Sequence, residues 1–493
     1  MCNVLFNSPQ FIFLFLPIVF TIYFILNSTA PLYIARAWLA SSSLFFYGYW
    51  NPSYLPLIFI SIATNFIIGR ALITYKRKSI LIAGIIFNLG LLGYFKYFDF
   101  FLANFNRLFS AEIPLLELVL PLAISFFTFQ QISYLVDCYK GKVDSYNFIN
   151  YALFITFFPH LIAGPIVHHK VMMPQFQNAA NQKINFENIA IGIFIFSIGL
   201  FKKVILADQF STTVLDGTQY LDTITFFDAW IVILSYTLQL YFDFSGYSDM
   251  AIGLALLFNI KLPINFNSPY KATNFQEITS RWHMTLTRFL YEYVYFPMNR
   301  FLARKLFPAL LLKISVNATT NISLILLFIL SGFWHGAGWN FIIWGLLIGI
   351  GIMIYREWSR RNKKLPVFLA WMLTFVYLNF TMVFFKLSDL NQAFMLIKAM
   401  LGLQGFILPE QLGQVLAPLK GMGILFESTP LKEKYQAVGM IIAGLLLVLL
   451  FKNTSEQAQS FKPNWKHTLF ILVILIYSIL NLTRVSEFLY FRF

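Results

Sequence analysis

Charged side chains are scarce in this chain of 493 residues, at 12% of the total, and acidic ones are scarcest, with 21 Asp and Glu against 36 Lys and Arg. Soluble globular domains carry about a quarter charged residues, so the composition excludes that class. Hydrophobic residues instead make up 58% of the chain, and 19% of the residues are aromatic. This composition predicts that lipid surrounds most of the chain, with aromatic rings at the two interfaces.

Cysteine is nearly absent, since only Cys2 and Cys138 occur. Two cysteines cannot make the disulfide framework of a small secreted domain, and their spacing is unlike that of a zinc site. Cys138 ends an apolar run, so we expect a buried structural thiol there.

The net charge of +15 comes from basic residues in short loops between apolar runs, so we expect contact with membrane lipid and no nucleic-acid partner. Lys and Arg in short loops mark the cytoplasmic side. With the N-terminus outside, the uncharged turn at 51–52 also falls outside, while the basic residues at 76–78, 140–142 and 356–364 fall inside. No basic region or cleavage site precedes the first apolar run, so we expect 11–26 to be a permanent span.

The apolar runs predict an all-α polytopic membrane protein with about 11–13 membrane segments, including re-entrant and interfacial helices. A span needs roughly 20 helical residues. The runs at 226–258 and 320–355 are too long for one span, and 148–167 is interrupted by Pro159, Gly164 and Pro165. The full set of candidate spans is 11–26, 34–50, 54–73, 79–98, 116–138, 188–207, 226–258, 320–355, 366–386, 435–451 and 467–484.

The run at 320–355 must break, because 36 helical residues would extend about 54 Å. The break is predicted at 331–340, where three glycines surround His335. Irregular backbone at membrane depth is tolerated where it lines a cavity, and a titratable group there is functional by default. We therefore expect His335 to line a cavity, although a neutral histidine bonded between helices is the alternative.

Segment 274–300 predicts one amphipathic helix in a membrane interface, with aromatic and charged residues on opposite faces. His283 falls on the seam between those faces. From this pattern alone, a structural role is favoured over a role in a protein cavity.

Segment 241–250 places Asp243 and Asp249 beside a Ser245-Gly246 interruption of the second overlong run. Carboxylates at membrane depth must be paired, hydrogen-bonded or hydrated. We expect them to brace a broken helix and to pair with Arg281 or Arg288, with direct catalysis as the alternative.

Three histidines in segment 157–170 suggest a metal, but a Gly-Pro break separates His160 from His168 and His169, and the spacing defines no third ligand. We predict no metal here. The adjacent pair is expected at a wet cytoplasmic edge.

Phosphate-binding loops, nucleophile elbows and kinase motifs are missing from the sequence. Five segments together instead resemble the membrane-bound O-acyltransferase family, in particular its bacterial polysaccharide-acetylating branch. They are SFFTFQQISYLVDCYKG (125–141), FFPHLIAGPI (157–166), YFDFSGYSDMAIG (241–253), RWHMTL (281–286) and SGFWHGAGWNFIIWG (331–345).

This resemblance implies a helical fold around a central funnel or tunnel in the bacterial cytoplasmic membrane, with cytoplasmic acetyl-coenzyme A as donor substrate and no permanently bound cofactor. His335 matches the family's catalytic histidine and His283 its second characteristic position. The resemblance further implies an extracytoplasmic SGNH-like acetyltransferase or another polysaccharide-modifying partner. The chain then divides into N-terminal helices (1–110), a catalytic core (111–355) and C-terminal helices (356–493).

The resulting hypothesis makes His335, through Nε2 or Nδ1, the general base on an acceptor hydroxyl, which attacks a thioester arriving from the opposite mouth. Trp334 and Asn340 would orient its imidazole, with Asp243, Ser245 and Asp249 in support, while His283 would position the acceptor or stabilise the oxyanion. The residues expected to attract the anionic donor are Arg281, Arg288, Lys202 and Lys203, although inside anchoring suits the lysines equally. The alternatives are D-alanyl or longer-acyl transfer from a carrier protein, and a conduit without bond chemistry.

Overall fold

The computed structural model describes the chain apart from residues 1–4, 144–146, 414–416, 428–433, 483–488 and 490–493. Across the described residues it consists of helices and one two-stranded parallel sheet, formed by β1 (Ile407–Pro409) and β2 (Leu425–Glu427). The prediction of an all-α polytopic membrane protein is confirmed. The helices α1–α9 are α1 (Leu16–Thr29), α2 (Leu32–Trp50), α3 (Leu55–Tyr75), α4 (Lys78–Leu92), α5 (Phe98–Phe109), α6 (Ile124–Tyr139), α7 (Phe148–Thr156), α8 (Phe158–Leu161) and α9 (His169–Gln177).

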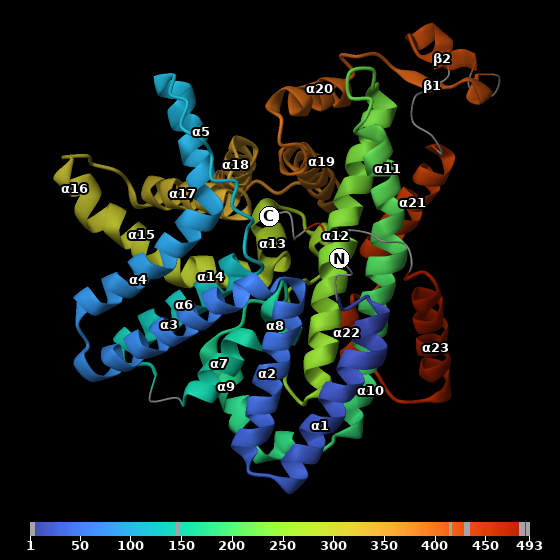
Figure 1. The fold of residues 1–493 in the computed structure, drawn as a ribbon. Helices are drawn as coiled ribbons and strands as arrows, with labels where there is room; N and C mark the ends of the chain where they lie inside the picture. Colours follow the sequence, from blue (N-terminus) through green and yellow to red (C-terminus); the bar gives the residue numbers. More distant parts are fainter. Residues whose placement is uncertain (1–4, 144–146, 414–416, 428–433, 483–488, 490–493) are drawn as a thin grey trace.

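Among the remaining helices, α10 and the 32-residue α12 pack side by side (Figure 1). Their bounds are α10 (Phe186–Phe201), α11 (Asp208–Gly217), α12 (Phe226–Leu257), α13 (Phe275–Arg281), α14 (Met284–Phe289), α15 (Phe296–Phe301), α16 (Phe307–Ala309), α17 (Val316–His335), α18 (Trp339–Arg360), α19 (Val367–Lys386), α20 (Leu390–Met400), α21 (Lys434–Leu450), α22 (Thr454–Gln459) and α23 (Trp465–Leu480). The π-helices η3 (Gly93–Tyr97), η5 (Lys202–Ala207), η7 (Leu290–Tyr295) and η8 (Leu302–Leu306) continue α4, α10, α14 and α15 without a break.

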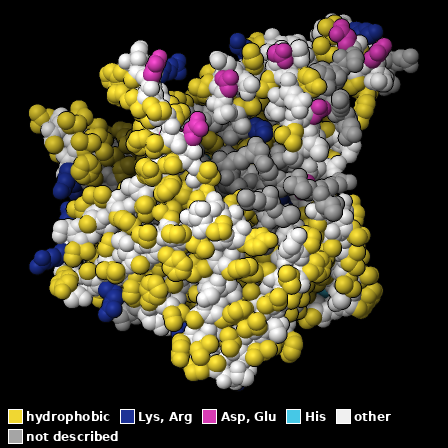
Figure 2. Space-filling model, in the orientation of Figure 1, with side chains coloured by type: hydrophobic (Ala, Val, Ile, Leu, Met, Phe, Trp, Pro, Cys, Tyr) yellow, Lys and Arg dark blue, Asp and Glu magenta, His cyan; other side chains and the backbone are white. Residues whose placement is uncertain are grey.

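Seven helical stretches among the described residues are long and apolar enough to cross a membrane. They are Phe11–Thr29, Pro52–Tyr75, Lys78–Phe109, Phe186–Gly217, Val316–His335, Trp339–Arg360 and Val367–Lys386, and α21 and α23 are shorter apolar helices. Large apolar side chains such as Ile67 and Phe368 point outward from them. Figure 2 shows hydrophobic side chains over most of one face, with the acidic ones gathered in its upper part. The protein is therefore a multi-pass membrane protein whose outer surface suits lipid.

The predicted break in 320–355 is confirmed, because α17 ends at His335 and α18 begins at Trp339. The two helices form an antiparallel hairpin of two spans. A Cβ on Gly336 would come within 2.1 Å of the Phe341 ring. The glycine therefore lets the turn close tightly behind the histidine.

The predicted break at Ser245-Gly246 is wrong, since α12 runs unbroken for 32 residues. Gly246 serves close packing: a Cβ on it would lie 2.8 Å from the Gly199 carbonyl oxygen of α10, and a Cβ on Gly199 would lie 2.6 Å from the Gly246 carbonyl oxygen. Small residues at a helix crossing let two backbones approach within a membrane. The glycine that predicted a break is therefore a contact between helices.

The single amphipathic helix predicted over 274–300 is also wrong. The segment divides into α13, α14, η7 and α15, and His283 adopts a left-handed conformation with φ 44° between α13 and α14. Asn265, from the preceding loop, explains the break: its backbone carbonyl accepts from Met284 N at 2.9 Å, and its Oδ1 accepts from Thr285 N at 3.3 Å. A tertiary contact thus caps the start of α14.

Two smaller boundaries differ from the sequence prediction. The run predicted at 116–138 becomes helical only from Ile124. The run predicted at 79–98 does not end there, because helical structure continues through α5 to Phe109. The interruption of 148–167 is confirmed by the separation of α7 from α8. Cys138 is a buried free thiol, as expected.

Candidate active site

His335 ends α17 inside a cage of aromatic rings. Its imidazole centroid lies 4.9 Å from that of Trp334, 5.2 Å from Trp344 and 5.3 Å from Phe385, each ring approaching edge-on. The residue is only 4% exposed. Three rings packed at these angles hold the imidazole in one orientation.

His335 nevertheless reaches two separate cavities. The first, here the Lys96 cavity, has a volume of about 290 Å³ and is lined by Lys96, Trp334 and His335 among others. The second, the His283 cavity, has a volume of about 50 Å³ and is lined by His283, Trp344 and His335 among others. His335 is the one described residue that lines both. The prediction that His335 lines a cavity is therefore confirmed. Its imidazole lies between the Lys96 cavity and the His283 cavity, and this position is here called the junction.

The left-handed turn directs His283 into the His283 cavity, where it is 2% exposed. Its Nδ1 lies 3.1 Å from Asn265 Oδ1, which also accepts from Thr285 Oγ1 at 2.9 Å. An amide oxygen only accepts hydrogen bonds, so Nδ1 of His283 carries the proton. Burial lowers the pKa of His283 to about 3, and the neutral ring therefore has an unprotonated Nε2. An unprotonated nitrogen accepts a hydrogen bond, which favours a positioning role over oxyanion stabilisation.

Lys96 is a site residue that the sequence analysis did not identify. Its Nζ donates to the Trp334 carbonyl at 2.5 Å and to the His335 carbonyl at 3.3 Å, and it lies 3.5 Å from Ser125 Oγ. Lys96 belongs to the π-helix η3, a distortion that often occurs at functional sites. The ammonium thus caps the C-terminal end of α17, where a cation is favourable.

Two buried indole N–H groups flank the junction. Trp334 Nε1 and Trp344 Nε1 have no hydrogen-bond partner among the described residues. Trp334 lines the Lys96 cavity and Trp344 lines the His283 cavity. An unmade buried hydrogen bond costs about 1–3 kcal/mol, so a bound substrate oxygen at either position would offset that cost.

Comparison with known proteins decides the class of this site. The sequence profile of the membrane-bound O-acyltransferase family matches residues 135–392. The chain is 43% identical to a peptidoglycan O-acetyltransferase of Helicobacter pylori, over 99% of this chain and 97% of that protein. This chain belongs to the membrane-bound O-acyltransferase family. It is an O-acyltransferase, and His335 and His283 lie within the part that the family profile matches.

Other relatives act on different polymers, as their names state. A probable alginate O-acetylase of Pseudomonas aeruginosa is 34% identical over 80% of this chain and 74% of its own length. A teichoic acid D-alanyltransferase of Streptococcus thermophilus is 29% identical over 50% of this chain and 59% of its own length. The names of these relatives therefore state two different acyl groups, acetyl and D-alanyl.

The predicted supporting residues lie in three helices: Trp334 is in α17, Asn340 is at the start of α18, and Asp243, Ser245 and Asp249 are in α12. Asn340 Nδ2 donates to the Phe384 carbonyl at 3.0 Å, a bond that ties the start of α18 to α19. Its predicted role in orienting His335 stays a prediction, as does the supporting role of Ser245, which is buried within α12.

The expected pairing of the two aspartates with arginine is wrong, because lysines of η5 take that place. Lys203 Nζ lies 2.5 Å from Asp243 Oδ1, and Lys202 Nζ lies 2.7 Å from Asp249 Oδ2. The Asp243 pair is 2% exposed on both sides, and breaking such a pair leaves a buried charge. These pairs brace α12 against η5, while a role of the lysines in donor binding stays a prediction.

The two arginines predicted to attract the donor lie in different places. Arg281 pairs with Glu277 at 2.8 Å and donates to the Asn267 carbonyl at 3.2 Å. Arg288 lines a third cavity of about 400 Å³, here the Arg288 cavity, together with His168 and Tyr293. Thr287 of α14 lines both this cavity and the His283 cavity, so the two cavities adjoin at that helix.

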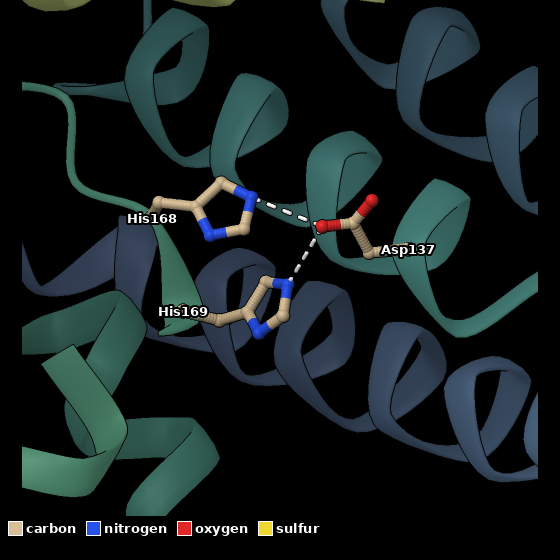
Figure 3. Close-up of side chains that lie close together, drawn as sticks. All are labelled: Asp137, His168 and His169. Atoms are coloured by element: carbon tan, nitrogen blue, oxygen red, sulfur yellow. Dashed lines mark hydrogen bonds and ion pairs between the residues drawn. The ribbon is translucent and has the colours of Figure 1, made fainter. Parts of the chain in front are cut away.

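His168 and His169 were expected at a solvent-exposed cytoplasmic edge. This prediction is wrong for His169, whose side chain is fully buried. It holds in part for His168, whose side chain is 22% exposed. Figure 3 shows both imidazoles directed at the carboxylate of Asp137, from α6. His160 lies apart, with Nδ1 3.4 Å from Gln130 Nε2. Asp137 was not considered in the sequence analysis, although a carboxylate within an apolar run is itself a signal.

Proposed function

We propose that this enzyme transfers an acetyl group from cytoplasmic acetyl-coenzyme A to a hydroxyl acceptor for O-acetylation of an extracytoplasmic polysaccharide, from the bacterial cytoplasmic membrane. The observation that carries the proposal is the position of His335 between the Lys96 cavity and the His283 cavity. Two substrates can approach one imidazole there from different directions. The relatives that acetylate peptidoglycan or alginate, as their names state, support the acyl group and the type of acceptor.

The sides of the membrane follow from the basic loops. Trp50 and Tyr54 line the Lys96 cavity and flank the turn at 51–52, which is predicted outside. The Arg288 cavity lies near Lys140, predicted inside, whose Nζ is 5.7 Å from the Tyr293 ring centroid. In this arrangement the acceptor enters through the Lys96 cavity. The anionic donor approaches past Arg288 and reaches the junction along α14.

The reaction follows general-base chemistry. His335 takes the proton of the acceptor hydroxyl, and the oxygen attacks the thioester carbonyl carbon. The tetrahedral intermediate then expels the coenzyme A thiolate, to which His335 returns the proton, so that an ester and a free thiol result. A positioned base contributes about 10²- to 10⁴-fold, and a thioester already has a good leaving group.

The remaining groups position the reactants. His283, with an unprotonated Nε2, accepts a hydrogen bond from a substrate O–H or N–H. The indole N–H groups of Trp334 and Trp344 have no partner among the described residues and can donate to the developing oxyanion. This scheme needs no metal at His335.

A partner completes delivery to the glycan. We propose an extracytoplasmic SGNH-like acetyltransferase or another polysaccharide-modifying protein that meets the outer mouth of the Lys96 cavity. The regular structure of the described residues is helical apart from one two-stranded sheet, and seven of the helical stretches are candidate spans, which supports a separate protein for binding a long polymer.

The test uses the full chain in lipid vesicles with acetyl-coenzyme A carrying a labelled acetyl group. We expect free coenzyme A thiol to appear together with label on a peptidoglycan or alginate oligomer, or on the co-reconstituted partner. Label transfer from a D-alanyl carrier protein, with acetyl-coenzyme A left intact, would support the competing acyl donor. Passage of a substrate without loss of the thioester would support a conduit.

A further inference from the structure

The Asp137 cluster, defined as Asp137, His168 and His169, lies outside the proposed reaction centre. His168 Nε2 is 3.0 Å and His169 Nε2 is 3.2 Å from the same carboxylate oxygen, Asp137 Oδ2. The three candidate ligand atoms all lie within 4.8 Å of one another. Figure 3 shows the three side chains converging from α6 and from the start of α9.

The spacing and chemistry of these atoms suit a transition-metal ion. Tetrahedral zinc with bonds of about 2.0–2.1 Å holds its ligand atoms roughly 3.3 Å apart, close to the two distances seen here. Two imidazoles and one carboxylate make a donor set that zinc and other first-row divalent ions prefer over magnesium or calcium. Tyr293 Oη, 3.2 Å from Asp137 Oδ2 and 2.7 Å from His168 Nε2, borders the same point.

Metal binding at the Asp137 cluster would require one hydrogen bond of His168 to break. His168 Nδ1 accepts from the Lys170 backbone N–H at 3.2 Å, which places the imidazole proton on Nε2. Coordination through Nε2 would require this proton to move and the Lys170 bond to open. One neutral hydrogen bond is weak compared with the coordination of a divalent ion by two imidazoles and a carboxylate. The local bond therefore does not prevent coordination.

An entry path is present. His168 and Tyr293 line the Arg288 cavity of about 400 Å³, so an ion can reach the cluster without unfolding of the surrounding helices. Lys142 Nζ lies 3.8 Å from the other carboxylate oxygen of Asp137, Oδ1, whereas both imidazoles contact Oδ2.

We propose that Asp137, His168 and His169 bind one divalent transition-metal ion of the zinc class, which fastens α6 to the start of α9. Tyr293, whose hydroxyl borders the site, lies in η7, the continuation of α14. This proposal replaces the sequence-based prediction of no metal. It is independent of the proposed acetyl transfer.

The test measures metal content and thermal unfolding, with zinc as the probe. Full-length protein purified without chelator should contain about one zinc ion per chain, and after chelator treatment its unfolding temperature should rise on addition of Zn²⁺. His169→Ala and Asp137→Asn should lose both the stoichiometric zinc and the rise. His160→Ala, which removes a buried histidine outside the cluster, should retain both.

The wild-type measurements keep the test decisive even where a variant fails to fold. Absence of stoichiometric zinc in wild-type protein, together with no rise in unfolding temperature, would overturn the proposal and leave the cluster as a hydrogen-bonded network. Equal zinc binding by wild type and His169→Ala would overturn it as well, since the ion would then sit elsewhere.

Discussion

His283, from the turn before α14, and His335, from the end of α17, line the same cavity, and both rings contact Trp334, with centroid distances of 6.2 Å and 4.9 Å. The first histidine is held by an amide cap at the start of α14, and the second by the end of α17. Their alignment therefore depends on how these two helix ends pack. Substitutions at the start of α14 and at the end of α17 can therefore test how each histidine is positioned.

His283→Ala should fold and retain partial acetyl transfer, with about a 10²-fold loss typical of removing one positioned polar group. His283→Gln, which keeps a hydrogen-bond acceptor near Nε2, should recover part of the loss. Turnover is measured as release of coenzyme A thiol. Normal turnover in His283→Ala would make this histidine purely structural.

Lys96→Met should lower kcat more than it raises KM, because it removes the cation that caps the His335 and Trp334 carbonyls without removing a main substrate contact. Lys96→Arg should restore part of kcat. Lys305→Met, the same change at an exposed position, is the control. Equal kinetics for Lys96→Met and Lys305→Met would contradict a positioning role.

Trp344→Phe keeps an aromatic ring beside His335 and removes the indole N–H, which has no partner among the described residues, together with part of the ring. If that group donates to the oxyanion, kcat should fall about 10²-fold with KM little changed. Trp465→Phe, at an indole that is 71% exposed, is the matched control. An unchanged kcat would remove Trp344 from the proposed chemistry.

Gly246→Ala should lower stability by about 1–3 kcal/mol, because its methyl group would meet the Gly199 carbonyl and α10 would have to move. The measurement is thermal unfolding in detergent. Gly439→Ala in α21, where nothing lies within 4 Å of the added carbon, should leave the unfolding temperature near that of wild type. A stable Gly246→Ala protein would mean that the helix crossing is looser than described.

The features that depend on neighbouring residues, such as helix length and helix breaks, could be predicted from the sequence. The length of 320–355 and its three glycines predicted the helix break and the cavity-lining His335, and the apolar runs predicted the membrane helices. The same argument failed for α12, because a glycine that permits a bend also permits a close helix crossing. Only the presence of Gly199 opposite Gly246 distinguishes the two outcomes.

The missed parts of the site depend on contacts distant in sequence. Periodicity over 274–300 could not reveal that Asn265 caps α14 and thereby turns His283 into the cavity. Lys96 lies far from His335 in the chain, and its role follows from carbonyl groups, which have no sequence signature. Asp137 completes a cluster with the later histidine pair in the same way, through tertiary packing.

The most direct test of the account is acetyl transfer by purified His335→Ala beside His467→Ala, a histidine of α23 changed in the same way. We expect both variants to unfold at the wild-type temperature within a few degrees, and His335→Ala alone to lose acetyl transfer by about 10²- to 10⁴-fold. Full thiol release and full acetyl transfer by the folded His335→Ala enzyme would contradict the assignment of His335 as the general base.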